Sequence, residues 1–302
     1  MKILITGANG LLGQKLVQLL SQQTDVEVIA TGLGKSRLPA SAGKFTFIPM
    51  DICNAAEVNE VIGAQKPEVV INTAAMTNVD QSETEQESCW KLNVSAVNHL
   101  IDACGKQDSF LLHLSTDFIF DGQDGPYDEE AKPNPISYYG ESKLAAEECL
   151  QKSNIRWAIA RTVLVYGIAH DMSRSNIILW VKNSIEQGKE LKIVDDQWRT
   201  PTLAEDLAMG CWLIAKKQAE GIFNISGKDL LTPYDMAMMT CDYFELDKSA
   251  IEKVDGSIFQ QTAKRPPKTG FNIDKARKVL GYEPHSFEEG IKILHEQITQ
   301  KV

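Results

Sequence analysis

The stretch "KILITGANGLLG", residues 2–13, is a short apolar run that ends in a glycine-rich turn. Leucines follow the turn at spacings that place them on one face of a helix. A strand, a glycine turn and a helix in this order form the unit that binds the pyrophosphate of a dinucleotide. The sequence therefore predicts a dinucleotide-binding site at the start of the chain.

Three glycines in this turn have separate tasks. Gly7 permits the tight turn, Gly10 lets the backbone approach a pyrophosphate, and Gly13 lets the helix pack close to the strand. We expect the phosphates at the helix N-terminus, where free N–H groups and the helix dipole favour an anion.

The first half of the chain continues with apolar runs separated by helical patterns. Further strands are predicted in four segments: "VEVIATG" (26–32), "EVVINTAA" (68–75), "FLLHLST" (110–116) and "WAIARTVLVYG" (157–167). Helices are predicted at 89–104 and 141–151. Buried strands that alternate with helices indicate an α/β fold with a doubly wound parallel sheet, the Rossmann architecture.

The pattern changes after about residue 166. We predict helices at 177–185, 203–217 and 286–298, with a short strand at 221–227. Residues 1–165 are thus expected to form the NAD(P)-binding domain. Residues 166–302 form a smaller, mainly substrate-binding α+β lobe, in which about 200–217 pack back on the first domain.

The composition excludes several classes of function. A net charge of −10 over 302 residues disfavours binding to nucleic acids or anionic membranes. The N-terminus lacks the features of a signal peptide, and no apolar stretch is long enough to cross a bilayer. The six cysteines form no CxxC pair and the five histidines show no metal-binding spacing. We expect a cytoplasmic protein with reduced thiols, no metal and no membrane or nucleic-acid partner.

The end of the second strand, "ATGLGKSR" (30–37), concerns the choice of cofactor. A site selective for NAD usually has an acid there for the ribose 2′-hydroxyl, but Thr31 holds the position. Lys35 and Arg37 follow and could pair with a 2′-phosphate. This predicts a preference for NADP(H), with NAD(H) still possible; the alternative is that both are solvated loop charges.

The stretch "SYYGESKLAAEE" (137–148) contains a tyrosine and a lysine on one helix face. Tyr139 and Lys143 are four residues apart, whereas Tyr138 is matched with Ser142. A nearby ammonium lowers the pKa of a phenol, which makes Tyr139 a candidate general acid.

The strand at 110–116 ends in two hydroxyls, Ser115 and Thr116. Ligands bind outside the carboxyl ends of strands in open α/β sheets, so a hydroxyl there could hydrogen-bond a substrate carbonyl. The alternative is that these side chains cap the next turn.

Five segments in this order carry a family resemblance: "TGANGLLG", "INTAAMTNVDQSE", "LSTDFIFDG", "YYGESK" and "DDQWRTPT". Together they resemble the extended short-chain dehydrogenase/reductases, and within these the dTDP-4-dehydrorhamnose reductase-like branch. The resemblance covers nearly the whole chain. It implies that Tyr139 donates a proton, that Lys143 activates it and binds the cofactor, and that Thr116 polarises the carbonyl, with Ser115 the weaker candidate.

The resemblance also implies a cofactor-binding set. Asn9, Leu11 and Leu12 would line the pyrophosphate with the three glycines. The remaining members are Asp51 and Ile52 beside the adenine, Ala74, Ala75 and Met76 beside the nicotinamide ribose, and Asn93, which would brace the active-site strand or be a helix-surface amide.

For the substrate, "DDQWRTPT" resembles the family's pocket loop. Gln197, Trp198 and Arg199 offer an amide, an aromatic face and a guanidinium suited to a nucleotide diphosphate, and Arg265 could be a second contact. The alternatives are packing for Trp198 and a solvated charge for Arg265. Leu164 stands where reductases of the dTDP-sugar typically carry a tryptophan, which leaves the exact sugar open.

The expected function is that of an NADP(H)-preferring reductase of a keto-sugar nucleotide, with a homodimer as the candidate assembly. One alternative is an epimerase or dehydratase of the same fold, although the Asp-Glu pair usual in dehydratases is replaced by Asp117 and Phe118. The other alternative is a non-catalytic, NADP-binding regulatory subunit.

Overall fold

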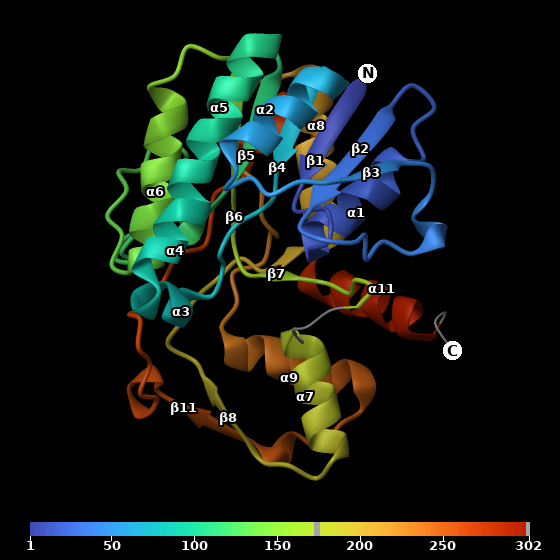
Figure 1. The fold of residues 1–302 in the computed structure, drawn as a ribbon. Helices are drawn as coiled ribbons and strands as arrows, with labels where there is room; N and C mark the ends of the chain where they lie inside the picture. The colour runs from blue at the N-terminus through green and yellow to red at the C-terminus, as the bar shows by residue number, and fades with distance from the viewer. Residues whose placement is uncertain (172–175, 300–302) are drawn as a thin grey trace.

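A single parallel sheet organises most of the molecule. The computed structural model describes residues 1–171 and 176–299, and in it the strands run in the order β10-β6-β5-β4-β1-β2-β3 (Figure 1). Their bounds are β1 Lys2–Thr6, β2 Glu27–Gly32, β3 Thr46–Pro49, β4 Val69–Asn72, β5 Phe110–Thr116, β6 Trp157–Thr162 and β10 Gly221–Asn224. Every neighbouring pair is parallel. The predicted doubly wound sheet is confirmed, and its order reverses between β1 and β4, where ligands bind in such folds.

Helices cover both faces of this sheet because strand side chains alternate between the faces. Ile3 and Ile5 of β1 pack on the face that carries α1 (Leu11–Leu20) and α8 (Ala204–Lys217). Leu4 packs on the opposite face. That face carries α2 (Ala55–Gln65), α5 (Ala96–Gln107) and α6 (Tyr138–Gln151), which lie side by side in Figure 1.

The second lobe is smaller and lies at the carboxyl ends of the strands (Figure 1). It contains α7 (Ile177–Glu186), α9 (Pro233–Phe244) and a parallel pair, β8 (Leu191–Val194) with β11 (Ile251–Val254). The apolar core of this lobe is formed by Val181, Leu191, Ile193, Ala237, Cys241 and Ile251. Helix α11 (Phe287–Thr299) packs against α9, and β7 (Val165–Tyr166) pairs with β9 (Thr202–Leu203).

Shorter elements complete the described chain. Helix α10 (Asp274–Leu280) packs on α8, and α3 (Val79–Thr84) and α4 (Gln86–Trp90) precede one π-helical turn at Lys91–Ser95. Turns of 3₁₀ helix lie at Ala40–Ala42, Asp117–Ile119, Lys248–Ala250 and Gly256–Ile258.

Two parts of the sheet differ from the sequence-based expectation. The run at 157–167 is divided, because the backbone turns at Leu164, whose φ of 35° ends the strand. The segment "GIFNISG" starts with β10, which pairs with β6 and extends the main sheet. Edge strand β3 was not predicted, since its four residues are only partly buried or exposed.

All six cysteines are free thiols, four of them buried. Within residues 1–171 and 176–299, no helix combines the length and apolar character needed to span a membrane.

Candidate active site

The glycine turn between β1 and α1 is closely packed on one side and open on the other. A Cβ on Gly13 would lie 2.4 Å from the Gly7 carbonyl oxygen, and one on Gly7 would lie 2.8 Å from the Ala74 nitrogen. Gly7 also has a φ of +65°. Gly10 caps α1 without a side-chain hydrogen bond, so the first N–H groups of the helix are available to an anion. These features fit the pyrophosphate of a dinucleotide.

Asn9 connects this turn to the loop that carries the two basic residues. Its amide nitrogen donates to the carbonyls of Leu33 and Lys35, and its amide oxygen accepts the Arg37 backbone N–H at 2.8 Å. Lys35 and Arg37 have exposed side chains. Both are therefore held near the glycine turn and are accessible to a 2′-phosphate.

The residues expected around the adenine and the nicotinamide lie along the strand ends. Leu11, Leu12, Asp51, Ala74, Ala75 and Met76 are half-buried and Ile52 is buried. Asn93 is also buried: its amide accepts from the Met76 nitrogen at 2.8 Å and donates to the Met76 carbonyl and to the Ser142 hydroxyl. Asn93 thus braces the segment after β4 against α6, and it is neither a surface amide nor a direct brace of β5.

Tyr139 lies in the first turn of α6, beside the end of β5. The Ser137 hydroxyl caps the helix, accepting the Gly140 N–H at 3.2 Å. A Cβ on Gly140 would lie 2.2 Å from the Phe118 carbonyl oxygen, so glycine allows the helix to approach this turn closely. The Tyr139 phenol consequently lies beside the Thr116 hydroxyl, with which it is hydrogen-bonded.

The pKa of Tyr139 differs from the expectation. Burial raises the pKa of the phenol above its ordinary value, and the hydrogen bond with Thr116 offsets only part of the effect. The predicted lowering by Lys143 was wrong for this structure, because the lysine amine is engaged elsewhere. Burial lowers the pKa of Lys143 to about 8. The phenol is therefore protonated at neutral pH, and burial makes it a weaker acid than a free phenol.

Lys143 ends a chain of buried polar groups that sequence reasoning overlooked. Its Nζ lies 3.1 Å from His113 Nε2 and 2.6 Å from the Leu114 carbonyl oxygen. His113 Nδ1 in turn lies 3.0 Å from the amide nitrogen of Asn72. An ionisable residue inside the apolar run "FLLHLST" was the available signal, since a buried polar group needs a partner.

The two hydroxyls at the end of β5 have different surroundings. Thr116 donates to Asp117 Oδ1 at 3.0 Å and accepts the Phe118 N–H at 3.2 Å, so it caps the following turn as well as facing Tyr139. Ser115 Oγ is buried and has no hydrogen-bond partner among the described residues. Ser115 therefore has unused hydrogen-bonding capacity at the end of β5.

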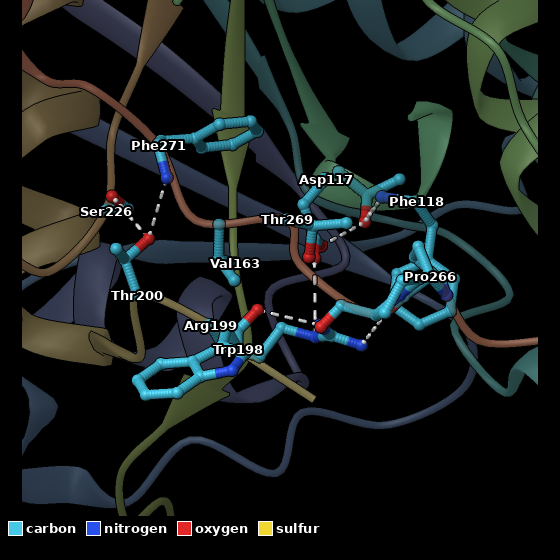
Figure 2. Close-up of polar contacts among 12 residues, drawn as sticks. Asp117, Phe118, Val163, Trp198, Arg199, Thr200, Ser226, Pro266, Thr269 and Phe271 are labelled. Carbon is cyan, nitrogen blue, oxygen red and sulfur yellow. Dashed lines mark hydrogen bonds and ion pairs between the residues drawn. The ribbon is translucent and has the colours of Figure 1, made fainter. Parts of the chain in front are cut away.

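Figure 2 shows Asp117 and Arg199 in a cluster that joins β5 to the second lobe. The Arg199 guanidinium donates to the carbonyls of Pro266, Pro267 and Trp198. The Asp117 carboxylate accepts from the Thr269 hydroxyl. Burial raises the pKa of Asp117, while Arg199 and Thr269 oppose the rise. Arg199 is therefore buried and connects the end of β5 to the backbone at Pro266 and Pro267. It presents no free face to a diphosphate, contrary to its sequence-based interpretation.

Other candidate substrate residues lie around this cluster. Gln197 is half-buried, whereas Trp198 and Leu164 are 40% and 44% exposed, which rules out core packing for Trp198. Arg265 forms a bidentate ion pair with Asp80, at 2.6 and 3.2 Å. It is therefore not a solvated charge; it ties its loop to α3. Within the described ranges, no group of His, Cys, Asp and Glu side chains could hold a metal ion.

Comparisons with known proteins identify the family of this chain. The family described as RmlD substrate binding domain matches residues 1–300. A dTDP-4-dehydrorhamnose reductase of Aggregatibacter actinomycetemcomitans is 30% identical over 96% of this chain and 97% of its own length. The methionine adenosyltransferase 2 subunit beta of Mus musculus is 28% identical over 96% of this chain and 86% of its own.

A solved structure extends the likeness to three dimensions. The crystal structure of a dTDP-4-dehydrorhamnose reductase from Clostridium acetobutylicum has a TM-score of 0.88 at 30% identity, covering 99% of this chain and 100% of the other. The protein therefore belongs to the RmlD substrate binding domain family, within the extended short-chain dehydrogenase/reductases.

Proposed function

We propose that this protein is an NADP(H)-preferring reductase of a keto-sugar nucleotide, similar in activity to dTDP-4-dehydrorhamnose reductase. The observation that carries the proposal is the meeting of Tyr139 and Thr116 at the carboxyl end of β5, in a fold that also has a phosphate-binding turn. Hydroxyls in this position suit a carbonyl substrate, and the turn suits a dinucleotide.

The cofactor would be held by the start of α1, with Lys35 and Arg37 at its 2′-phosphate. NADPH supplies a hydride when bound. Tyr139 is protonated at neutral pH and would give its proton to the carbonyl oxygen, where negative charge develops as the hydride arrives. Thr116 would hydrogen-bond the same oxygen, and Ser115, whose buried hydroxyl has no partner among the described residues, is the weaker candidate. Thr116 orients the phenol.

The dTDP-4-dehydrorhamnose reductase relatives support the keto-sugar nucleotide as the substrate class. Trp198 and Gln197 are the side chains that we propose contact the nucleotide or its diphosphate, because both are at least partly accessible. Leu164 borders the sugar from the exposed turn after β6.

A dehydratase is disfavoured by the environment of Asp117. An acid that transfers protons to a substrate must reach it, and Asp117 is buried against Arg199 and Thr269. A regulatory subunit is the second candidate, favoured by the 28% identity with a methionine adenosyltransferase 2 subunit beta.

The test is NADPH oxidation with a panel of keto-sugar nucleotides, beginning with dTDP-4-dehydrorhamnose. Stoichiometric NADPH consumption supports a reductase, and turnover of sugar without net consumption indicates an epimerase. Firm NADPH binding, seen as a rise in melting temperature, without turnover of any substrate would favour the regulatory subunit.

A further inference from the structure

The side-chain amide of Asn9 is bonded entirely to the loop that follows β2. Its Nδ2 atom donates to the carbonyl oxygens of Leu33 and Lys35, at 3.3 and 3.1 Å, and its Oδ1 atom accepts the Arg37 backbone N–H at 2.8 Å. Turning the amide over would set its N–H groups against the Arg37 N–H and its oxygen against two carbonyls. Both amide hydrogens are therefore used, and this side chain has no N–H left to donate to a pyrophosphate.

The backbone around Asn9 is fixed from two directions, which gives the amide a defined position. The Ala8 N–H donates to the Thr31 carbonyl at 2.9 Å and ties the glycine turn to the end of β2. The Gln14 amide, which is 1% exposed, donates to the Asn9 carbonyl at 3.1 Å. The Asn9 side chain also lies against Gly32, where a Cβ would be 3.4 Å from Asn9 Nδ2. The turn is thus the base from which Asn9 holds the loop.

No carboxylate or free hydroxyl at the end of β2 is available to a ribose 2′-hydroxyl. Dinucleotide sites selective for NAD use an acid there, and no acidic residue occurs between residues 31 and 37. Thr31 holds that position, but its side chain is buried and its hydroxyl donates to the Ile5 carbonyl at 3.1 Å. Recognition of the 2′ position therefore depends on the loop that follows.

The loop at residues 33–37 has the features of an anion site. Gly34 has a φ of +67°, and the backbone N–H groups of residues 34–36 have no hydrogen-bond partner among the residues that the structure describes. Successive free N–H groups in such a turn form concavities that bind anions. The exposed side chains of Lys35 and Arg37 add two positive charges. The anion that distinguishes NADP(H) from NAD(H) is the 2′-phosphate.

We propose that Asn9 is a positioning residue that sets the selectivity for NADP(H), because it holds residues 33–37 in the conformation that presents Lys35, Arg37 and the free N–H groups to the 2′-phosphate. This role deepens the proposed function and depends on its preference for NADP(H). Without the amide, the loop loses three hydrogen bonds to the glycine turn, and cofactor binding must then order the loop at an entropic cost. The cost falls on the 2′-phosphate alone, since the start of α1, which would hold the pyrophosphate, is unchanged.

The first measurement is the affinity for both cofactors by isothermal titration calorimetry, which needs no substrate. Asn9→Ala should weaken NADPH binding at least about tenfold and NADH binding less than about threefold. The matched control is Asn59→Ala, which removes an amide of α2 that donates to the Ala55 carbonyl and should change neither affinity. Equal losses for the two cofactors would place Asn9 at the shared pyrophosphate and overturn the proposal, as would an unchanged NADPH affinity.

A double-mutant cycle separates positioning from direct contact. Lys35→Ala with Arg37→Ala removes the charges that the loop presents. Asn9→Ala added to this pair should therefore lower NADPH affinity by less than about threefold more, compared with at least about tenfold in the wild-type background. Full additivity would mean that Asn9 binds the cofactor independently of these two side chains, and would contradict the proposal.

Hydrogen exchange reports on the loop itself. The Arg37 N–H is accepted by Asn9 Oδ1, so it should exchange at least about tenfold faster in Asn9→Ala, while amides within α1 keep their protection. Unchanged exchange at Arg37, or loss of protection throughout α1, would show that Asn9 supports the turn instead of the loop and would overturn the proposal.

The role of Asn9 and the proposed reduction fail separately. If no keto-sugar nucleotide is reduced, the two affinities still decide the role of Asn9. If the wild type binds NADPH and NADH equally tightly, the proposal on Asn9 is overturned together with the NADP(H) preference, whereas reduction of a keto-sugar nucleotide by either cofactor still stands.

Discussion

The Arg199 Nε atom lies 3.8 Å from Asp117 Oδ2, and the two side chains are 6% and 3% exposed. Asp117 directly follows Thr116 at the end of β5, whereas Arg199 belongs to the loop between β8 and β9. Figure 2 shows how the Arg199 guanidinium also reaches the backbone at Pro266. One buried ion pair therefore fixes the end of β5, where Thr116 lies, relative to two segments of the second lobe.

Removing the arginine should destabilise the protein strongly. In Arg199→Leu, the Asp117 carboxylate remains buried without its cation, which typically costs about 3–5 kcal/mol. Urea unfolding measures the loss. The matched control is Lys152→Ala, which breaks an exposed ion pair with Glu148 and should change stability by less than about 0.5 kcal/mol. If both substitutions lower the free energy of unfolding equally, the buried Arg199–Asp117 pair contributes no more to stability than an exposed pair.

The two adjacent tyrosines should behave differently when the hydroxyl is removed. Tyr139→Phe should lower kcat by about 10²–10⁴-fold, because the general acid is lost, with NADPH binding retained. Tyr138→Phe is the control: Tyr138 packs against Trp90, with ring centroids 6.3 Å apart, and does not face the Thr116 hydroxyl. Turnover and thermal unfolding of both variants are the measurements. Full activity of the Tyr139→Phe variant would show that the Tyr139 hydroxyl is not the proton donor.

Most strands of the sheet were predictable because their burial is uniform. β1, β4 and β5 are continuous apolar runs with almost every residue buried, and such runs have few other structural solutions. β3 has no fully buried residue, so its sequence carries little signal. The break at Leu164 was not predictable, because a positive φ at a leucine is imposed by its tertiary surroundings.

The candidate site was predictable where one short stretch carries several members. Tyr139 and Lys143 share a helix, and the three glycines share a turn. The sequence predicts Arg199 and Arg265 as contacts of a diphosphate, and the structure pairs them with carboxylates far away in sequence, Asp117 and Asp80. The spacing of residues along the chain does not reveal contacts between residues that are far apart in sequence. The same reason hid the pairing of His113 with Asn72.

Cofactor choice should depend on the loop that Asn9 holds. Lys35→Ala with Arg37→Ala should raise the KM for NADPH at least about tenfold and leave the KM for NADH within about twofold, because only NADPH has the 2′-phosphate that an arginine or lysine binds. Lys44→Ala, at another exposed lysine near this domain's edge, is the charge control. Parallel increases for both cofactors would contradict a role in selecting the 2′-phosphate.

Glycine substitutions should have opposite effects at two helical positions. Gly13→Ala places a Cβ 2.4 Å from the Gly7 carbonyl oxygen and 2.6 Å from Ala8 Cα, so the helix must move away and both stability and NADPH affinity should fall, stability by about 1–3 kcal/mol. Gly63→Ala, in α2, meets no atom within 4 Å and should stabilise by about 0.5–1 kcal/mol. Thermal unfolding with and without NADPH tests both; a neutral Gly13→Ala would mean that the close packing of α1 is dispensable.

The buried Lys143 amine should lower the free energy of unfolding by an amount that depends on pH. Burial lowers its pKa from 10.5 to about 8, so between these values the unfolded chain binds more protons than the folded one. Stability from this residue therefore rises with pH across that window, and the cost below it is about 3 kcal/mol. Lys143→Met should thus be inactive yet unfold at a higher temperature at pH 7. Its advantage over the wild type should shrink as the pH approaches about 9.5, because the folded lysine is by then neutral. A constant difference across this range would show that the buried amine titrates near its ordinary pKa, and that its stability cost comes from lost packing instead of from its charge.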